Sequence, residues 1–169
     1  MIIEWGGHSP KVQPGAYLAA NATLIGEVSI EESASIWYGA VLRGDGRDDS
    51  HIQIGNGTNI QDNAVIHGQT TVGRDVVVGH AAILHGCTVE DACLIGMGAT
   101  VLNDAVIGAG SVVAAGSVVV KNTVIPPGSM VMGLPAKVKR PLTSEEIEQI
   151  SLDAAFYRQL AESQLPKTD

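Results

Sequence analysis

Three histidines in the middle of this chain have the type and spacing of a metal site. They are His67, His80 and His85, and the first and last are 18 positions apart. Three imidazoles are a common ligand set for catalytic zinc, which keeps its fourth position open for water. Because the intervals along the chain are unequal, the fold must decide whether the three rings can meet.

The elements that position these histidines come from a six-residue repeat. Aliphatic residues recur every six positions from Val12 to Leu84, with one miss at Asp48, and again from Val89 to Val131. A period of six fits neither a helix nor an ordinary strand, and it is typical of a parallel β-helix. Three hexapeptides close one triangular coil, and stacking at about 4.8 Å gives roughly seven coils. We therefore predict an all-β solenoid whose branched side chains fill the interior.

The miss at Asp48 marks an interruption in the repeat. The segment near 44–51 is polar and contains glycine, so it predicts a loop that leaves the prism. Loops that project from solenoids often carry binding residues. The β-helix, with this loop included, is assigned to residues 1–141.

A C-terminal α-helix follows the repeat, which ends after Pro135. Thr143 and Glu146 have the spacing of a capping box, and apolar residues then recur at helical spacing. The pattern predicts a helix from about 144 to 163 packed along the prism, followed by a frayed tail. Residues 142–169 are this helix and tail, and the whole chain is one domain.

The repeat also assigns each histidine to a face of the prism. His67 and His85 directly follow inward aliphatic residues one coil apart, so they should stack and point outward from one face. His80 comes two positions after its aliphatic residue, on the neighbouring face and one coil from Asp62.

Two more polar residues are assigned by the same count. Arg43 and Gln61 are also 18 positions apart. We therefore expect them to stack on the face that carries His80, which would make two half-sites on adjacent faces.

Neighbouring subunits can bring the two half-sites together. Two faces of one coil diverge around a corner, but around a threefold axis the first face of one subunit meets the second face of the next. We predict a metal held by His67 and His85 of one chain and His80 of another. A homotrimer is a natural packing for prisms by analogy with the fold.

Several ordered motifs resemble the gamma-class carbonic anhydrase family over nearly the whole chain. They are Arg43-Gly44-Asp45, the segment from Ile54 to Asp62, His67, Gly79-His80, Leu84-His85-Gly86-Cys87 and the segment from Gly133 to Lys137. The resemblance implies a left-handed β-helix, a homotrimer, and zinc (or iron or cobalt) held by the three histidines across subunit interfaces.

The resemblance also implies roles for polar residues. Arg43 and Asp45 would pair across the interface, and Gln61 would orient the metal-bound hydroxide. Zinc lowers the pKa of its bound water to about 7, so hydroxide is available to attack carbon dioxide and form bicarbonate. Asp62 and Asp45 would fix imidazoles or the arginine. Tyr157 would either reach a neighbour's site or pack on the prism.

The chain departs from the family pattern in two places. Gly46 stands where the best-studied form has a glutamate, and the residues between His67 and His80 stay in hexapeptide register. No loop there can carry the proton-shuttle glutamate, so the chain resembles the short form of the family. His51, Asp48 and Asp49 are substitutes for the shuttle, or their loop is simply solvated.

Other functions fit the same fold. Hexapeptide acyltransferases use one catalytic histidine and an acyl thioester between subunits, whereas three histidines with Arg43, Asp45 and Gln61 favour a metal. A thioester hydrolase that uses the same metal site is a related alternative. A catalytically weak metal-binding scaffold is the third.

Composition excludes several partners. A formal net charge of −8 argues against nucleic acid, and the sequence has neither a signal peptide pattern nor an apolar stretch long enough for a membrane helix. Two cysteines make no disulfide framework. Cys87, beside His85, is a soft metal ligand or a packing residue. The expected location is the cytoplasm.

Overall fold

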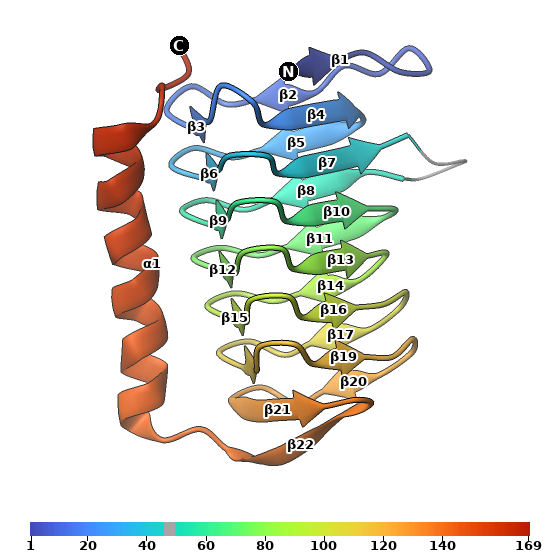
Figure 1. The fold of residues 1–169 in the computed structure, drawn as a ribbon, viewed down its shortest axis with the longest axis vertical. Helices are drawn as coiled ribbons and strands as arrows, with labels where there is room; N and C mark the ends of the chain where they lie inside the picture. Colours follow the sequence, from blue (N-terminus) through green and yellow to red (C-terminus); the bar gives the residue numbers. More distant parts are fainter. Residues whose placement is uncertain (46–49) are drawn as a thin grey trace.

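The computed structural model describes residues 1–45 and 50–169. Gly46, Asp48 and Asp49, which the sequence singled out, lie outside the described residues. The rest of the chain forms a β-solenoid of about seven turns with one helix alongside (Figure 1). The predicted fold class is confirmed.

Three sheets form the sides of the prism, and the chain visits them in turn (Figure 1). The first sheet contains β1 (Ile2–Ile3), β4 (Thr23–Gly26), β7 (Val41–Gly44), β10 (Val65–His67), β13 (Ile83–His85), β16 (Thr100–Val101) and β19 (Val118–Val119). The second contains β2 (Lys11–Val12), β5 (Val28–Ile30), β8 (Ile52–Ile54), β11 (Thr70–Val72), β14 (Thr88–Val89), β17 (Val106–Ile107) and β20 (Val124–Ile125). The third contains β3 (Tyr17–Leu18), β6 (Ser35–Ile36), β9 (Asn59–Ile60), β12 (Val77–Val78), β15 (Leu94–Ile95), β18 (Val112–Val113), β21 (Ser129–Gly133) and β22 (Ala136–Pro141).

The aliphatic positions of the repeat form the core. On the first sheet, Leu42, Ile66 and Leu84 are fully buried and pair in register from one coil to the next. Small buried residues such as Ala64 and Ala82 come two positions before these aliphatic residues, at the corners where the chain must turn tightly. The interior is therefore a continuous column of branched side chains, and the polar residues beside it project outward.

The interruption near Asp48 changes the count of the repeat. Strand β7 ends at Gly44 and β8 begins at Ile52. Leu42 consequently pairs with Ile66, 24 positions away, whereas Ile66 pairs with Leu84, 18 positions away. Any count of residues between two coils that passes through this segment is therefore six larger than the usual 18.

Helix α1 (Ser144–Gln164) lies along the third sheet (Figure 1). Thr143 is its N-cap and forms the predicted capping box with Glu146. The helix ends one residue beyond the predicted end. Trp37 packs edge-on against Tyr157, with ring centroids 5.6 Å apart. No helix in the described ranges is long and apolar enough to cross a membrane.

The prediction of a frayed tail is wrong. Leu165 is buried, and the carbonyl of Pro166 accepts a hydrogen bond from the backbone of Leu18. The backbone N–H of Thr168 donates to Ala16 at 2.8 Å. The tail is ordered because it supplies partners to backbone groups at the N-terminal end of the third sheet.

Candidate metal site

His67 and His85 form the centre of the candidate site. They are directly paired residues of β10 and β13, with ring centroids 4.9 Å apart and planes inclined at 70°. Nδ1 of His67 lies 3.0 Å from Nε2 of His85. The predicted stacking on one face is confirmed.

Two side chains meet the other nitrogen of His67. Oδ1 of Asp45 lies 3.3 Å from Nε2, and the guanidinium of Arg43 lies 3.2 Å from the same atom. In one tautomer Nε2 carries the proton and donates to the carboxylate of Asp45, so Nδ1 has the lone pair. In the other, Nε2 accepts a hydrogen bond from Arg43, so the proton is on Nδ1. The pair Arg43–Asp45 therefore acts on the tautomer of this ring.

The expectation that Arg43 stacks on Gln61 is wrong. Arg43 is on β7 and is paired with His67 on the first sheet, whereas Gln61 directly follows β9 of the third sheet. The count of 18 fails because it crosses the six extra residues after Gly44. Arg43 also contacts Asp45 within the same chain, at 3.1 Å.

His80 belongs to the other half-site, as its position in the repeat predicted. It follows β12 of the third sheet, and its Nδ1 lies 2.8 Å from Oδ2 of Asp62. A carboxylate accepts but does not donate, so in the neutral ring Nδ1 carries the proton and Nε2 keeps its lone pair. Asp62 thus fixes the imidazole in a form that can bind a metal.

Sequence reasoning missed a third partner, Asn103. Its Oδ1 lies 3.0 Å from Nδ1 of His85. Asn103 is 18 positions after His85, but a five-residue step lies between them, and Leu84 pairs with Val101 only 17 positions on, so the 18-residue spacing did not identify it. Each of the three candidate imidazoles therefore has a polar neighbour on its own chain.

The environment favours a neutral His67. Burial lowers the pKa of this imidazole, and the charges of Arg43 and His85 lower it further, against the opposing effect of Asp45. Only the neutral imidazole has a lone pair for a metal. The electrostatics are thus consistent with a ligand role.

The donor set fits a small divalent cation. Two nitrogens bound to one tetrahedral zinc at 2.0–2.1 Å are about 3.3 Å apart, close to the separation found between His67 and His85. Within residues 1–45 and 50–169 of a single chain, no group of three His, Cys, Asp or Glu side chains is placed to hold a metal. The stacked pair supplies two candidate ligands, and His80 is on another face.

Gln61 and Tyr157 line a cavity beside His80. It has a volume of about 490 Å³ and lies between α1 and the third sheet. Gln61 is buried and donates from Nε2 to Asn59 Oδ1 at 3.1 Å. Burial raises the pKa of the Tyr157 phenol, and Asp62 and Asp153 raise it further. Both side chains therefore lie close to the His80 half-site of their own chain.

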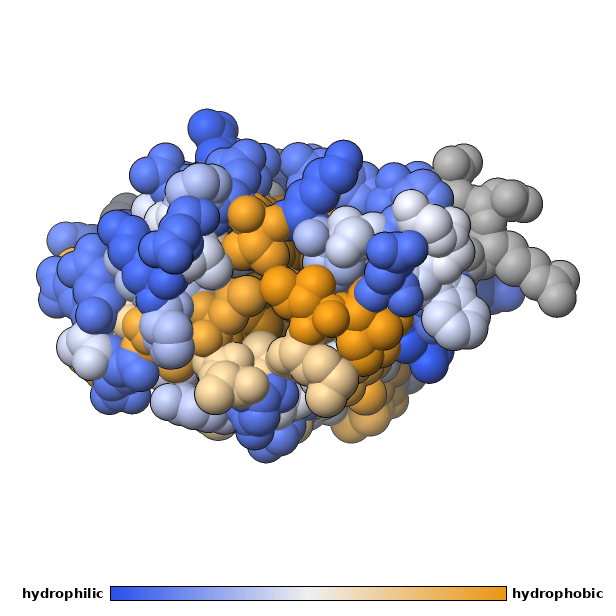
Figure 2. All heavy atoms as spheres, turned by 90° about the horizontal axis from the view of Figure 1, so that it is seen from above, coloured by the Kyte–Doolittle hydropathy of each residue, from blue (hydrophilic) through white to orange (hydrophobic). Residues whose placement is uncertain are grey.

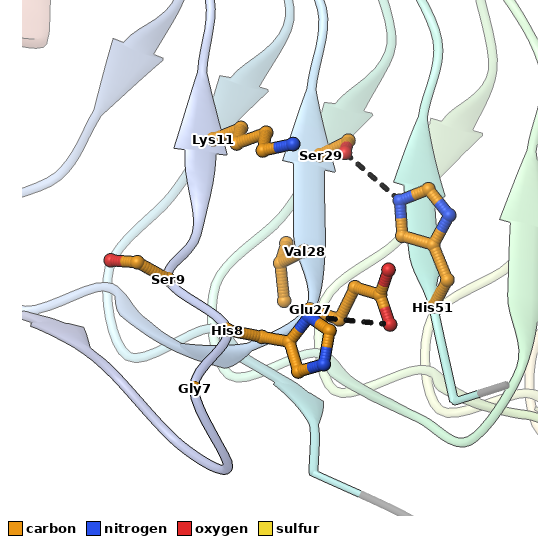
Figure 3. Close-up of a pocket in the computed structure, with 8 residues that line it drawn as sticks. All are labelled: Gly7, His8, Ser9, Lys11, Glu27, Val28, Ser29 and His51. Carbon is orange, nitrogen blue, oxygen red and sulfur yellow. Dashed lines mark hydrogen bonds and ion pairs between the residues drawn. The ribbon is translucent and has the colours of Figure 1, made fainter. Parts of the chain in front are cut away.

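The other two histidines lie elsewhere, and Cys87, two residues after His85, is buried. Burial raises the pKa of Cys87 to about 12, which favours the packing interpretation of this thiol. A separate pocket has a volume of about 230 Å³, and the distance between His8 and Glu27 there is 3.9 Å. Figure 3 shows that His51 bonds to Ser29 in the same pocket. These side chains pair with each other on and beside the second sheet, so the structure does not bring His51 to the stacked histidines.

Known proteins resemble this chain over most of its length. The family model for bacterial transferase hexapeptide (six repeats) matches residues 86–121. Gamma carbonic anhydrase 2, mitochondrial, of Arabidopsis thaliana is 47% identical over 164 residues, which are 91% of this chain and 58% of the plant protein. The chain thus spans little more than half of that relative.

Two further relatives match over nearly their full length. A protein named "Probable carbonic anhydrase" of Methanocaldococcus jannaschii is 44% identical over 150 residues, which are 86% of this chain and 92% of that one. The crystal structure of a hexapeptide transferase family protein from Anaplasma phagocytophilum matches with a TM-score of 0.93 and 43% identity, covering 97% and 98% of the two chains.

The fold and the paired histidines define a hexapeptide-repeat β-solenoid protein with a candidate metal site. Within that class, the chain belongs to the gamma carbonic anhydrase family. The resemblance that the sequence motifs indicated is confirmed.

Proposed function

We propose that this protein is a metal-dependent carbonic anhydrase that interconverts carbon dioxide and bicarbonate at sites shared between subunits of a homotrimer. One observation carries the proposal: two imidazole nitrogens of one chain face each other at 3.0 Å, while the third candidate ligand, His80, is on another face. Zinc is the proposed metal, with iron or cobalt as alternatives.

The surface around the stacked histidines supports contact with a second copy. Val65 of β10 and Ile83 of β13 each come directly before the buried residue of their strand, and they point outward beside the rings. The two residues are 38% and 42% exposed. Apolar side chains in a row on a flat sheet are typical of a surface that another chain covers. A threefold arrangement would bury this row and bring His80 of the neighbour to the pair.

The chain's own residues have separate roles in this proposal. Asp62 accepts the Nδ1 proton of His80, and Asp45 takes the corresponding place at Nε2 of His67. When bound, zinc lowers the pKa of a water to about 7 and so supplies hydroxide at neutral pH. Gln61 orients the reacting oxygen by hydrogen bonding, and Arg43 holds Asp45 and offers a positive charge to bicarbonate.

Proton removal limits the expected rate. Hydration releases one proton for each bicarbonate formed, and a fast enzyme needs a base to carry it to solvent. Asp45 is held by Arg43 and Asp62 by His80, so neither is a free acceptor. We therefore expect hydration to be slow in weak buffer and to increase with the concentration of an imidazole buffer.

Metal analysis with stopped-flow hydration of carbon dioxide on anaerobically purified protein tests the proposal. The expected result is close to one metal per chain and a rate that disappears with chelation and returns with added metal. His67→Ala should abolish both the metal content and the hydration rate. Folded protein that takes up no zinc, iron or cobalt would refute the proposal.

An acyltransferase is the second candidate, because the hexapeptide model and the Anaplasma phagocytophilum relative carry transferase names. A thioester hydrolase at the same metal site is related to it. The 490 Å³ cavity beside His80 is mostly apolar and would admit an acyl group. Measured affinity for acetyl-CoA in metal-free protein would favour this candidate, whereas metal-bound but inactive protein would favour a scaffold.

We place the protein in the cytoplasm. Cys87 and Cys93 are both free and buried, which suits a reducing compartment. The plant relative is named as mitochondrial, so localisation of a tagged protein in its own cells is the appropriate test.

A further inference from the structure

The three histidines differ in the chemistry of the side chain that holds each one. His67 and His80 have carboxylates, Asp45 at 3.3 Å and Asp62 at 2.8 Å. His85 has the amide of Asn103, whose Oδ1 is 3.0 Å from Nδ1. An amide orients a ring without adding a negative charge, so Asn103 is the one uncharged partner among the three.

We infer that Asn103 is a positioning residue that fixes the tautomer of His85 and thereby sets the affinity of the site for its metal. The part of this inference that concerns affinity rests on the proposed function. The part that concerns the tautomer is a property of the metal-free chain.

The hydrogen bond determines which nitrogen of His85 is free. Oδ1 of Asn103 can only accept, so Nδ1 of His85 must carry the proton. A neutral imidazole has one N–H, and Nε2 therefore keeps its lone pair. That atom is the one 3.0 Å from Nδ1 of His67, so Asn103 turns the lone pair of His85 toward the proposed metal.

The backbone holds Asn103 firmly in this place. A Cβ added at Gly86 would lie 2.5 Å from Nδ2 of Asn103, so the glycine beside His85 makes room for the amide. The backbone N–H of Asp104 donates to Gly86 at 2.7 Å, and the carbonyl of Asn103 accepts from Asn122 at 3.0 Å. Asn103 is thus anchored to the coil on each side.

The absence of charge has a consequence for affinity. A carboxylate behind a ligating imidazole raises the basicity of the ligand, and loss of such an outer partner typically weakens metal binding 10–100-fold. We expect Asn103→Leu to weaken zinc binding by that factor, because it cannot accept a hydrogen bond. Asn103→Asp should bind zinc more tightly than the wild type, because it accepts the same bond and adds charge.

Two measurements test the inference on the full chain. Long-range 1H–15N spectra of metal-free protein should show His85 protonated at Nδ1 in the wild type and in Asn103→Asp, and a mixture of tautomers in Asn103→Leu. Competition with a zinc-binding dye should rank the affinities as Asn103→Asp, wild type, Asn103→Leu. Thr88→Ala, which lines the same cavity as Asn103, is the matched control and should match the wild type in both.

The outcomes separate this inference from the proposed function. Wild-type His85 protonated at Nε2, or a leucine variant that binds zinc as tightly as the wild type, would overturn the inference and leave the metal site intact. Wild-type protein with the expected tautomer but without zinc affinity would overturn the proposed function and the affinity part together. If Asn103→Leu does not fold, the wild-type tautomer and the aspartate variant still decide the result.

Discussion

Nδ1 of His67 lies 3.0 Å from Nε2 of His85 in the next coil. The backbone sets this distance, since the two residues are paired in register on adjacent parallel strands. Strands in a sheet are about 4.8 Å apart, so neighbouring imidazoles can converge on one ion without any movement of the chain. The pair is preorganised, and in the proposed function its third ligand, His80, comes from a second chain.

Mixed trimers test the sharing of the site between chains. Subunits with His67→Ala keep His80, and subunits with His80→Ala keep His67 and His85. A complete site therefore forms where His67 and His85 come from a His80→Ala subunit and His80 comes from a neighbouring His67→Ala subunit. After unfolding and refolding of an equal mixture, about one quarter of all sites should be intact. The measurement is zinc bound per chain after gel filtration.

The control for this experiment is a mixture of His67→Ala and His85→Ala subunits. These two histidines are proposed to come from the same chain, so no arrangement of neighbours restores both. Equal zinc content in the two mixtures would contradict the shared site.

Substitutions of Tyr157 test how much the packing of helix α1 on the prism contributes to stability. Its ring packs edge-on against Trp37 at 5.6 Å. Tyr157→Ala should lower the free energy of unfolding by about 1–2 kcal/mol through lost burial and lost ring contact. Tyr157→Phe keeps the ring and should stay within about 0.5 kcal/mol. Urea unfolding measures both.

The same phenylalanine variant examines the hydroxyl of Tyr157. If the hydroxyl takes part in the chemistry, the hydration rate falls while stability and zinc content do not change. An unchanged rate would assign Tyr157 to packing alone.

The capping box predicts an acid dependence of stability. A hydrogen bond from Arg140 and a second from the backbone of Thr143 together lower the pKa of Glu146 from its ordinary 4.5 to about 2. Because the folded pKa is below the unfolded one, this stabilisation is complete above about pH 4.5 and is lost as pH falls through about 2. Glu146→Gln should be less stable than the wild type at pH 7.

The difference between these two proteins should shrink on acidification. Urea unfolding at several pH values measures it, and the curves should converge as the pH approaches 2. A difference that stays constant from pH 7 to 2 would show that the charge of Glu146 is not the cause.

A substitution of Gly79 tests the close approach of this backbone to the next coil, beside His80. A Cβ there would lie 2.7 Å from the backbone nitrogen of Met97 and 2.9 Å from the carbonyl of Ile95. Gly79→Ala should destabilise by roughly 1–3 kcal/mol, because backbone atoms must move. It should also weaken zinc binding by displacing the neighbouring histidine.

Gly98 provides the comparison for that substitution. Its φ is +65° and a Cβ there would meet nothing within 4 Å. Asn63 and Asn122 adopt the same left-handed conformation at other corners, with φ of 58° and 59°. Gly98→Asn should therefore change the free energy of unfolding by less than about 0.5 kcal/mol. Equal losses for both variants would exclude a special role for the approach at Gly79.

Most of the fold could be predicted from the sequence because the repeat is nearly unbroken. A period of six places Ile66 and Leu84 inside and His67 and His85 outside, and the structure agrees. Errors arose where the period breaks. The period predicts the wrong sheet for Arg43, because Arg43 pairs with His67 at a spacing of 24 rather than 18.

Contacts that depend on the end of the chain could not be predicted. The ordered tail follows from backbone groups of Leu18 and Ala16 that need partners, and no periodic signal in residues 165–169 indicates this. Asn103 was missed for a different reason. Its spacing was visible, but its side chain comes one position later in the hexapeptide than that of His85, because a five-residue step separates them.

Strand β22 limits the length of the prism. It runs antiparallel to β21 and carries Lys137, Lys139 and Arg140 along an exposed edge. An unpaired parallel edge would be a template for another chain, and a charged strand of opposite direction discourages such elongation. The other end is different, since Figure 2 shows apolar side chains gathered there, with Met1 and Ile2 exposed. At the β22 end, the charged antiparallel strand therefore discourages the third sheet from pairing with the sheet of another molecule.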